Sequence, residues 1–521
     1  MKEATTMNYQ LQDYRRRVLG CFLGKNAGGT LGMRDEWHRR INHVDGYVHE
    51  ITGEPLPNDD MDLQLVWLVA LEEQGVSVDA GLLGDYWMYY ITPHWAEYGN
   101  CKENMRCGLQ PPFSGTVNNP YKDSCGAYIR SEIWACLAPG CPEIAVKYAY
   151  EDALVDHGEG EGLYAEVFCA AMESAAFLEK DIRRLLQIGL SYIPDDCAVA
   201  RAVRLAEKLY DDGTSWQEAR DEILRNFLGG FIFTISDEDV EKGFTNGKVG
   251  WEAPSNIGMV VIALLYGEGD FGKTLCLAVN CGEDTDCTAA TAGSLLGIIL
   301  GIDGIDEKWA KPVGTRLKTA CLNLGELGNL GNQLPKDIFE LQKRIEVLAP
   351  QVLSLHRADL LLGNGPTDAT GELFCPDHSW LYRGPDTARF RFPFFDIDVS
   401  YENGPSIIPG TEKRITFTVH NRYKTSENFL IRIYSCENSE WNVAPSSALV
   451  HVPEGIWFKN REQITFTFSF GRASDGQLTD ISYRAVAEFS TPSRSGVMLV
   501  PLYFIHNPNA FTSNKGGNIP L

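Results

Sequence analysis

Two clusters of acidic residues carry the residue types that could do chemistry, and each lies directly before an apolar segment with helical spacing. The first is residues 58–62 (Asn-Asp-Asp-Met-Asp), and the second is residues 282–287 (Gly-Glu-Asp-Thr-Asp-Cys). If both helices begin at the same end of a bundle, the clusters meet and offer six or more oxygen ligands. Such oxygens suit a hard cation, and the cation would relieve the repulsion between neighbouring carboxylates. The sequence therefore predicts a divalent-cation site, with Mg²⁺ as the first choice.

A purely structural interpretation also fits each cluster taken alone. Asn and Asp are frequent N-caps, because their side chains accept hydrogen bonds from the free N–H groups of the first helical turn. The segment after the first cluster is a clear helix start, since Leu63, Val66, Trp67, Ala70 and Leu71 recur at helical intervals. Capping explains one cluster well, and it explains the pair less well.

The composition excludes several classes of protein. The chain has 521 residues, of which 44% are hydrophobic, and 70 acidic against 46 basic side chains leave a net charge of −24. A length of this kind indicates more than one domain, and the acidic surplus repels nucleic acid. The 14 cysteines lie in apolar runs without zinc-ligand spacing, so we expect reduced core residues. The N-terminal residues show no export signal, and no apolar run reaches the roughly 18 residues of a membrane span, which predicts a cytoplasmic protein.

The pattern of apolar residues changes once along the chain. Up to residue 355 it has helical periods, and an i, i+4 ladder of small residues (Ala289, Gly293, Gly297, Gly301) predicts close helix packing. Glycine and proline interrupt every period in residues 356–389. Alternating β-branched and aromatic residues follow in five segments: 414–419, 429–434, 463–470, 482–489 and 497–505. We predict an all-α domain (1–355), a linker (356–389), a β-sandwich (390–508) and a polar tail (509–521).

Three motifs in the same order resemble the ADP-ribosylglycohydrolase family, which includes the dinitrogenase-reductase-activating glycohydrolase and the ADP-ribosyl-acceptor hydrolases. They are a glycine-rich opening helix (20–32) that leads to Glu36, the acidic triplet 58–60 before a helix, and the Asp-Thr-Asp of residues 284–286 before a small-residue helix. The resemblance covers roughly residues 10 to 310, and the predicted β-sandwich lies outside it.

The resemblance implies an all-α fold that holds one or two Mg²⁺ ions, with Mn²⁺ as the alternative. Carried over by position, the metal ligands would be four aspartates and the side-chain oxygen of one asparagine: Asn58, Asp59, Asp60, Asp284 and Asp286. Glu36 would approach the scissile bond, so Glu36 and Asp60 are the candidates for proton transfer. Two positions depart from the family pattern: Asn58 and Cys287 both replace threonine, and a thiol is a poor ligand for Mg²⁺.

The substrate site implied by the resemblance begins at residues 124–130. This segment is similar to the family's diphosphate-binding loop, so Ser124 and Gly126 become candidate substrate contacts, although Cys125 replaces an asparagine. Alternatively, the segment is only a helix start, and Arg130 is a surface or structural cation. His157 corresponds to a histidine that lies near the substrate ribose.

Two further expectations concern residues outside the main motifs. Trp251 and Asn256 precede another apolar helix and are candidate substrate contacts, although packing is the alternative role for the tryptophan. Glu151 and Asp152 are expected on a solvated helix face.

We therefore predict a Mg²⁺-dependent hydrolase that cleaves a glycosidic bond at a ribose-like anomeric carbon, nominally of ADP-ribosyl N- or O-glycosides. Two alternatives stay open: a hydrolase of a nucleoside or another glycoside, and a catalytically silent protein that binds a sugar nucleotide. The expected partner is a small glycoside or an ADP-ribosylated substrate, with no nucleic acid and no membrane, and the sequence does not indicate an oligomeric state.

Overall fold

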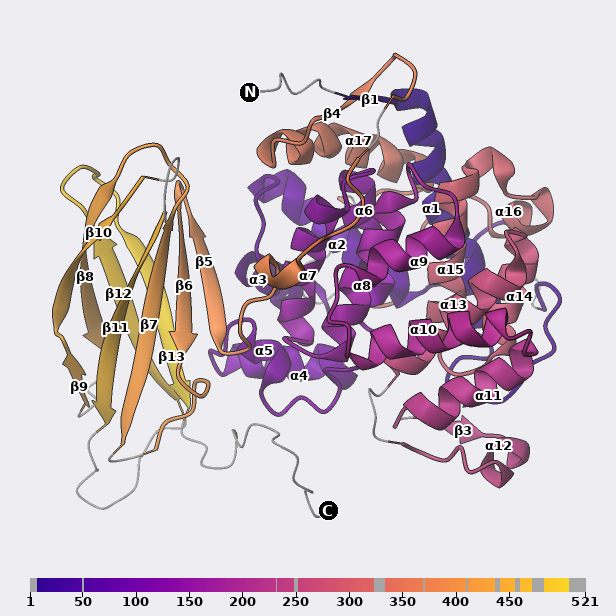
Figure 1. Cartoon of the computed structure of the whole chain (residues 1–521), viewed down its shortest axis with the longest axis horizontal. Helices are drawn as coiled ribbons and strands as arrows, with labels where there is room; N and C mark the ends of the chain where they lie inside the picture. Colours follow the sequence, from indigo (N-terminus) through magenta and orange to yellow (C-terminus); the bar gives the residue numbers. More distant parts are fainter. Residues whose placement is uncertain are drawn as a thin grey trace.

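The computed structural model contains a large helical body and a smaller body of strands (Figure 1). It describes residues 7–48, 51–230, 232–247, 252–322, 333–368, 371–408, 411–435, 441–454, 460–470 and 482–505. The first hydrophobic core lies among the helices, and a second core lies between the sheets. This arrangement confirms the predicted fold class, an all-α domain followed by a β-sandwich.

The helical body holds seventeen α-helices among the described residues. The first eight are α1 (Leu11–Gly32), α2 (Asp59–Gln74), α3 (Ala80–Tyr90), α4 (Ala96–Arg106), α5 (Phe113–Thr116), α6 (Glu132–Leu137), α7 (Pro142–Asp156) and α8 (Glu161–Ala175). The others are α9 (Ile182–Leu190), α10 (Ala198–Asp211), α11 (Trp216–Phe227), α12 (Asp237–Glu241), α13 (Ala253–Gly267), α14 (Phe271–Asn280), α15 (Thr285–Leu300), α16 (Glu307–Val313) and α17 (Ile338–Leu355). Short 3₁₀ turns are η1 (Tyr128–Arg130), η2 (Ile302–Gly304) and η3 (His378–Trp380).

Two small parallel sheets accompany the helices. The strand β1 (Met7–Gln10) pairs with β4 (Leu360–Gly363), and β2 (His38–Arg39) pairs with β3 (Thr234–Ile235). Strand β4 lies in the segment predicted as a linker. Because β4 pairs with β1, the chain after α17 returns to the N-terminal strand before it continues to the sandwich.

Helices α1 and α15 pack along their small residues, as the ladder predicted. Gly20, Gly24 and Gly28 of α1 face the backbone of α15, and a Cβ atom at any of them would overlap a carbonyl oxygen of α15. Gly24 meets Gly293 in this way, and Gly20 meets Gly297. Since side chains do not separate the two backbones, the end of α1 and the start of α15 are held in a fixed relation.

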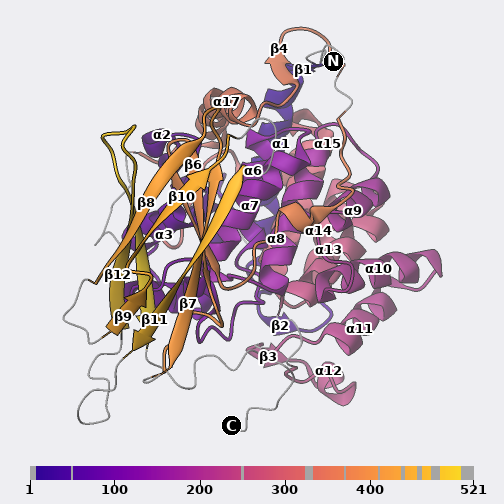
Figure 2. The ribbon, with the colours of Figure 1, turned by 60° about the vertical axis from the view of Figure 1, so that its left-hand side comes forward.

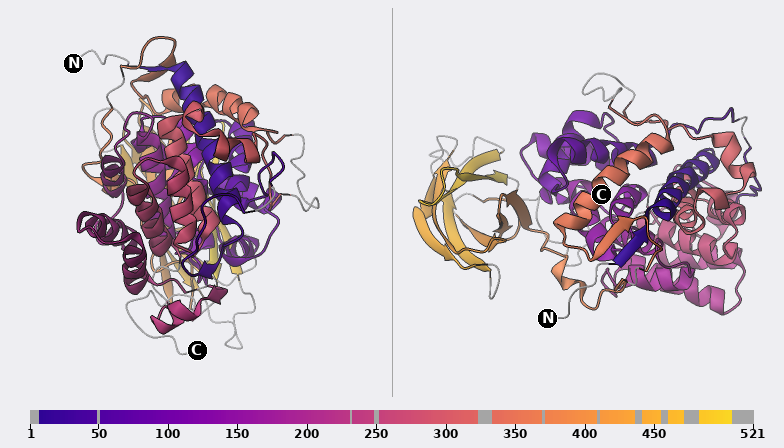
Figure 3. Two further views of the ribbon diagram at one scale, coloured as in Figure 1. Left: turned by 90° about the vertical axis from the view of Figure 1, so that its right-hand side faces the viewer. Right: turned by 90° about the horizontal axis from the view of Figure 1, so that it is seen from above.

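The β-sandwich consists of two antiparallel sheets, with strand orders β5-β6-β7-β11-β9 and β10-β8-β12-β13. The strands are β5 (Thr387–Phe392), β6 (Phe395–Tyr401), β7 (Glu412–Asn421), β8 (Glu427–Ser435), β9 (Trp441–Ala444), β10 (Ser447–Val452), β11 (Arg461–Phe470), β12 (Ser482–Ser490) and β13 (Met498–Ile505). The view from above shows the two curved layers facing each other (Figure 3). Phe417 of β7 and Phe489 of β12 meet between them at 5.4 Å, which illustrates how alternate aromatic residues fill this core.

The sandwich lies to one side of the helical body (Figures 1 and 2) and contacts it through apolar and charged residues. Phe113 of α5 packs edge-on against Tyr401 of β6, with ring centroids 5.0 Å apart. Glu151 of α7 is buried. Its carboxylate forms ion pairs with Arg383 at 2.7 Å and with Arg391 of β5 at 3.5 Å. The expectation that Glu151 lies on a solvated face is therefore wrong, because these distant arginines cover it. Among the described residues, every helix is too short or too polar to cross a bilayer.

Candidate active site

The two acidic clusters lie together at the N-terminal ends of α2 and α15. Asn58 caps α2, since its side-chain oxygen accepts the N–H of Asp60 at 2.8 Å. The other end of the same side chain donates to Asp286 Oδ2 at 3.1 Å, and this bond joins the two helix starts. The capping interpretation and the site interpretation are thus both compatible with Asn58. The C-terminal end of α1 leads to Glu36 in the same region, because Thr285 Oγ1 donates to the Gly32 carbonyl at 2.7 Å.

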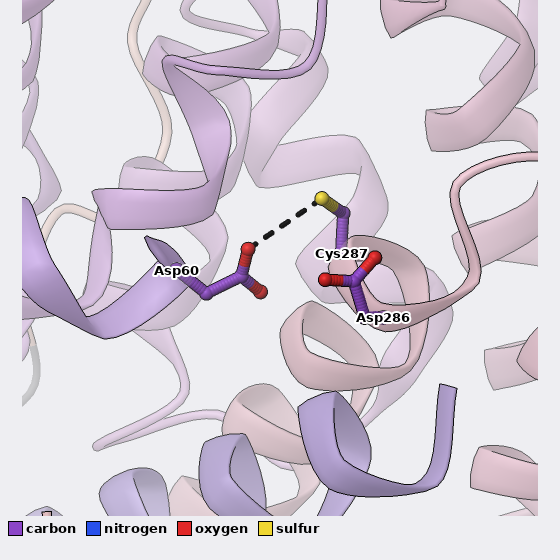
Figure 4. Close-up of side chains that lie close together, drawn as sticks. All are labelled: Asp60, Asp286 and Cys287. Atoms are coloured by element: carbon purple, nitrogen blue, oxygen red, sulfur yellow. Dashed lines mark hydrogen bonds between the residues drawn. The ribbon is translucent and has the colours of Figure 1, made fainter. Parts of the chain in front are cut away.

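Two groupings of possible metal ligands share Asp286. In the first, one carboxylate oxygen each from Glu36, Asp284 and Asp286 lie within 4.8 Å of one another. In the second, Asp60, Asp286 and the thiol of Cys287 satisfy the same limit. Figure 4 shows the Cys287 thiol directed at Asp60, to which it donates at 3.5 Å, with the Asp286 carboxylate beside it. The first grouping contains only oxygen donors, whereas the second includes a sulfur that suits a hard cation less well.

The site carboxyls are held in a state that disfavours their negative charge. Burial, followed by the charges of Asp286 and Asp59, raises the pKa of Glu36 to about 9. Burial and then Asp286 raise the pKa of Asp59 to about 6. Burial, reinforced by Asp286, also raises the pKa of Asp284 well above its usual range. These shifts mean that the site accumulates more carboxylate than its surroundings balance.

The donor set fits a divalent cation. Among the described residues, no Lys, Arg or His forms an ion pair with Glu36, Asp59, Asp284 or Asp286, whereas Lys25 approaches Asp60 at 3.7 Å. One carboxylate oxygen of each of Asp60, Asp284 and Asp286 is buried without a hydrogen-bond partner. Buried carboxylate oxygens are normally paired or coordinate a metal. We conclude that these side chains are arranged for a positive charge that the described residues do not supply.

The backbone just before Asp284 is strained and firmly held. Glu283 has φ 71°, in the left-handed region that non-glycine residues seldom adopt. Its carboxylate accepts Arg39 Nε at 2.6 Å and Arg39 Nη2 at 2.9 Å, and both side chains are buried. The Asp284 N–H donates to Asn256 Oδ1 at 3.1 Å. These contacts orient Asp284, and Asn256, predicted as a substrate contact, lies beneath it.

The site opens into a cavity of about 580 Å³, within the range of small-molecule sites. Ser124 and Gly126 line this cavity, as do Asn58 and Cys287. The described acidic residues that line it are Glu36, Asp59, Glu97, Glu252, Asp284 and Asp286, and the aromatic ones are Trp37, Trp95, Tyr98, Tyr121 and Phe233. The cavity therefore has an acidic floor and aromatic walls.

The structure places the other predicted substrate contacts at different depths. His157 does not line the cavity among the described residues; it lies behind Ser124, with Nε2 at 3.3 Å from the serine hydroxyl and Nδ1 at 2.9 Å from Asp156. Asn256 is also behind the cavity wall, because its amide contacts Cys125 and the Glu252 carbonyl. Trp251 lies outside the described residues.

Arg130 is a structural cation and not a surface one. It is fully buried, with Nε at 2.9 Å from Asp152 Oδ1 and Nη2 at 2.6 Å from Asp156 Oδ1. Asp152 also accepts Trp134 Nε1 at 2.9 Å. The expectation that Asp152 lies on a solvated helix face is wrong, since Arg130, 22 residues earlier in the sequence, reaches it inside the core.

Several side chains that shape the site were missed by the reasoning from sequence. Lys25 of α1 is buried behind the metal-site carboxylates, with Nζ at 2.7 Å from Glu132. Tyr98 donates to Asp59 Oδ2 at 3.3 Å, and Glu97 beside it lines the cavity. A lysine within a glycine-rich, apolar helix was a readable signal of a buried charge; Glu97 and Tyr98 carried no comparable signal.

The sequence profile of the ADP-ribosylglycohydrolase family matches residues 10–342. The chain therefore belongs to the ADP-ribosylglycohydrolase family, a family of hydrolases, and the match includes both acidic clusters and the whole cavity. The sandwich follows the matched region. No curated protein matches the sequence.

Solved structures give weaker likenesses. An ADP-ribosylglycohydrolase-related protein complex is 19% identical, with a TM-score of 0.39, over 66% of this chain and 99% of that one. A FixG-related protein from Vibrio parahaemolyticus is 12% identical, with a TM-score of 0.17, over 22% and 98%. WR4, an MSP family member of C. elegans, is 11% identical, with a TM-score of 0.15, over 22% and 100%. All three TM-scores are below 0.5, so the family assignment rests on the profile alone.

Proposed function

We propose that the protein is a divalent-metal-dependent hydrolase that cleaves a glycosidic bond at a ribose-like anomeric carbon. The observation that carries this proposal is the set of buried carboxylate oxygens without partners on the floor of a small-molecule cavity, in a chain of the ADP-ribosylglycohydrolase family. Mg²⁺ is the expected ion, since oxygen ligands dominate, and Mn²⁺ is the alternative.

The metal ligands in this proposal are Asp59, Asp60, Asp284 and Asp286, with Asn58 as a further oxygen donor. Asp286 belongs to both groupings, so it would contribute to either position if two ions bind. When bound, a divalent cation would orient neighbouring sugar hydroxyls and polarise the reacting centre. The ion pair between Glu283 and Arg39 and the hydrogen bond from the Asp284 N–H to Asn256 would keep Asp284 in place during this binding.

Glu36 is the proposed proton carrier. Burial, Asp286 and Asp59 raise its pKa to about 9, so its carboxyl keeps a proton more readily than an exposed glutamate does, as a general acid requires. In hydrolysis, the bond between the anomeric carbon and the leaving group breaks, and the oxygen of a water molecule bonds to that carbon. Glu36 would give its proton to the leaving group and recover one from the water. Asp60 is the alternative carrier, since burial raises its pKa as well.

Product analysis tests this function directly. The panel contains ADP-ribosyl-arginine and ADP-ribosyl-serine, suggested by the family, together with nucleosides and aryl ribofuranosides. We expect release of a free sugar product with Mg²⁺ or Mn²⁺ and none with a chelator. Glu36→Gln should lower the rate by about 10²–10⁴-fold while the stabilisation by metal persists. If no member of the panel is cleaved under any metal condition, the proposed hydrolase is wrong.

A second candidate function, ligand binding without catalysis, is favoured by Cys287. Its thiol belongs to a ligand grouping that otherwise consists of carboxylates, and it donates to Asp60. A sulfur there weakens the grouping for a hard cation. Thermal stabilisation by metal and D-ribose, with no turnover in the wild type or in Cys287→Thr, would support this candidate; turnover that increases in Cys287→Thr would exclude it.

A further inference from the structure

Glu97 places a negative charge in the cavity wall beyond the proposed metal ligands. It is the second residue of α4, it is buried, and its carboxylate lies directly over Gly126. A Cβ atom at Gly126 would overlap Glu97 Oε1 where it now lies, so the absence of a side chain at Gly126 leaves room for this position of the carboxylate. Ser124 favours the ionised form of the same carboxylate, although burial outweighs it and raises the pKa of Glu97. The segment expected to bind a diphosphate is thus occupied by an acidic side chain.

The charges around Glu97 do not compensate for it in favour of an anion. Among the described residues that line the cavity, six are acidic and none is Lys, Arg or His. The basic side chain nearest to Glu97 is His157, which lies within 4.8 Å of its carboxylate but is also paired with Asp156 behind the cavity wall. Arg130 pairs with Asp152 and Asp156, and Lys25 pairs with Glu132. A metal held by the first grouping would offset the charge of the floor. Glu97 belongs to a separate grouping, with Asp156 and His157, so a cation on the cavity floor would not be bound by its carboxylate.

The rest of the wall suits an uncharged ring. Trp95 and Phe233 line the cavity and are 54% and 71% exposed, which is unusual for such large apolar side chains. Trp37 packs edge-on against Phe233 at 5.8 Å and so supports it. The faces of sugars and aromatic leaving groups pack well on aromatic side chains, whereas a phosphate gains nothing from them.

We infer that the substrate is an unphosphorylated glycoside, a sugar joined to an uncharged or cationic leaving group, and that Glu97 is the residue that rejects phosphate. This inference rests on the proposed hydrolase function and specifies its substrate class. The physical cause is the repulsion between the Glu97 carboxylate and a substrate phosphate at a poorly solvated wall. Glu97 would thus give specificity by weakening the binding of phosphorylated ligands.

A matched pair of substrates tests the inference: 4-nitrophenyl ribofuranoside and its 5-phosphate, each as both anomers, assayed with excess Mg²⁺ or Mn²⁺. Burial raises the pKa of Glu97 to about 7, so the assay is made at pH 8, where the carboxylate is largely ionised. We expect kcat/KM to favour the unphosphorylated compound by at least 10-fold. Glu97→Gln keeps the shape of the side chain and removes its charge. This variant should reduce the preference for the unphosphorylated substrate at least 10-fold, mainly through a lower KM for the 5-phosphate substrate.

The control is Glu103→Gln, an exposed residue on the same helix, which removes one charge outside this cavity and should leave the preference unchanged. Equal or faster cleavage of the 5-phosphate, or of ADP-ribosyl-arginine, by the wild type would overturn the inference. If neither compound is cleaved, calorimetric titration of the wild type with D-ribose and D-ribose 5-phosphate decides the inference separately, and the hydrolase proposal fails only if the rest of the substrate panel is also not cleaved. Tighter binding of ribose supports it; tighter binding of the phosphate, or no binding of ribose, overturns it.

Discussion

Two buried groups of carboxylates in the helical body differ in how their charge is balanced. In the paired cluster (Arg130, Asp152 and Asp156), one guanidinium contacts both aspartates, and although burial opposes it, Arg130 helps to lower the pKa of Asp156 to about 2. In the site cluster (Glu36, Asp59, Asp284 and Asp286), the pKa of Glu36 is instead raised to about 9. A guanidinium thus contacts the first group, whereas among the described residues no Lys, Arg or His forms an ion pair with the second.

The largest expected effect follows from breaking the paired cluster. Arg130→Met removes the guanidinium from two buried carboxylates and leaves His157 as the basic neighbour of Asp156, so we expect a loss of about 3–5 kcal/mol in the free energy of unfolding. Urea unfolding followed by circular dichroism measures this loss. Arg183→Met is the matched control, because its ion pair with Asp211 is exposed to solvent and should contribute little to stability. Equal effects of the two substitutions would contradict the comparison.

In the site cluster, we expect the removal of one charged group to increase the free energy of unfolding. Asp284→Asn removes one of several mutually repelling charges, so the metal-free variant should be more stable than the metal-free wild type, on the order of 1 kcal/mol. The same variant should lose most of its stabilisation by Mg²⁺ and at least about 10²-fold in the rate of glycoside cleavage. Thermal unfolding with and without metal, together with the product assay, tests both parts. If the metal-free variant were less stable than the metal-free wild type, the Asp284 carboxylate would be stabilised by its protein neighbours without any cation, and the comparison would be wrong.

A smaller effect concerns the contact between the two bodies. Burial favours the neutral form of Glu151, but Arg383 and Arg391 outweigh it and lower the pKa from 4.5 to about 2. Its contribution to stability is therefore present above pH 4.5 and is lost as the pH falls towards 2. Arg383→Met should cost about 1–2 kcal/mol at pH 7, since Arg391 remains, and the difference from the wild type should shrink between pH 5 and pH 3. A difference that is constant across this range would refute the coupling.

The parts of the fold that sequence reasoning predicted are those with local patterns. Apolar residues at helical spacing after Asn58 predicted α2, and small residues four apart predicted the close contact of α15 with α1, since both features depend on neighbours within a few turns. The solvated face expected for Glu151 and Asp152 was wrong because burial there depends on arginines elsewhere in the chain, one of them 232 residues away. Local periodicity carries no information about such partners.

The candidate site shows the same division. The acidic clusters were recognisable because carboxylates gather before helix starts, and the structure joins them through the hydrogen bond between Asn58 and Asp286. The charge of the cavity wall was not predictable, because Glu97 reaches Gly126 from another helix. The charge of the cavity wall was therefore less predictable than the meeting of the two acidic clusters.

The backbone contact between α1 and α15 has a consequence for the choice of ion. Because glycines of α1 touch carbonyl oxygens of α15, the segments that carry Glu36, Asp284 and Asp286 cannot spread apart to suit a larger ionic radius. Any widening would have to come from α2, which carries Asp59 and Asp60 and is anchored to α3 by the tilted pair Trp67 and Trp87 at 6.1 Å. If a cation binds as proposed, discrimination between Mg²⁺ and Ca²⁺ would then depend on the packing of these two indoles, although neither is a proposed ligand.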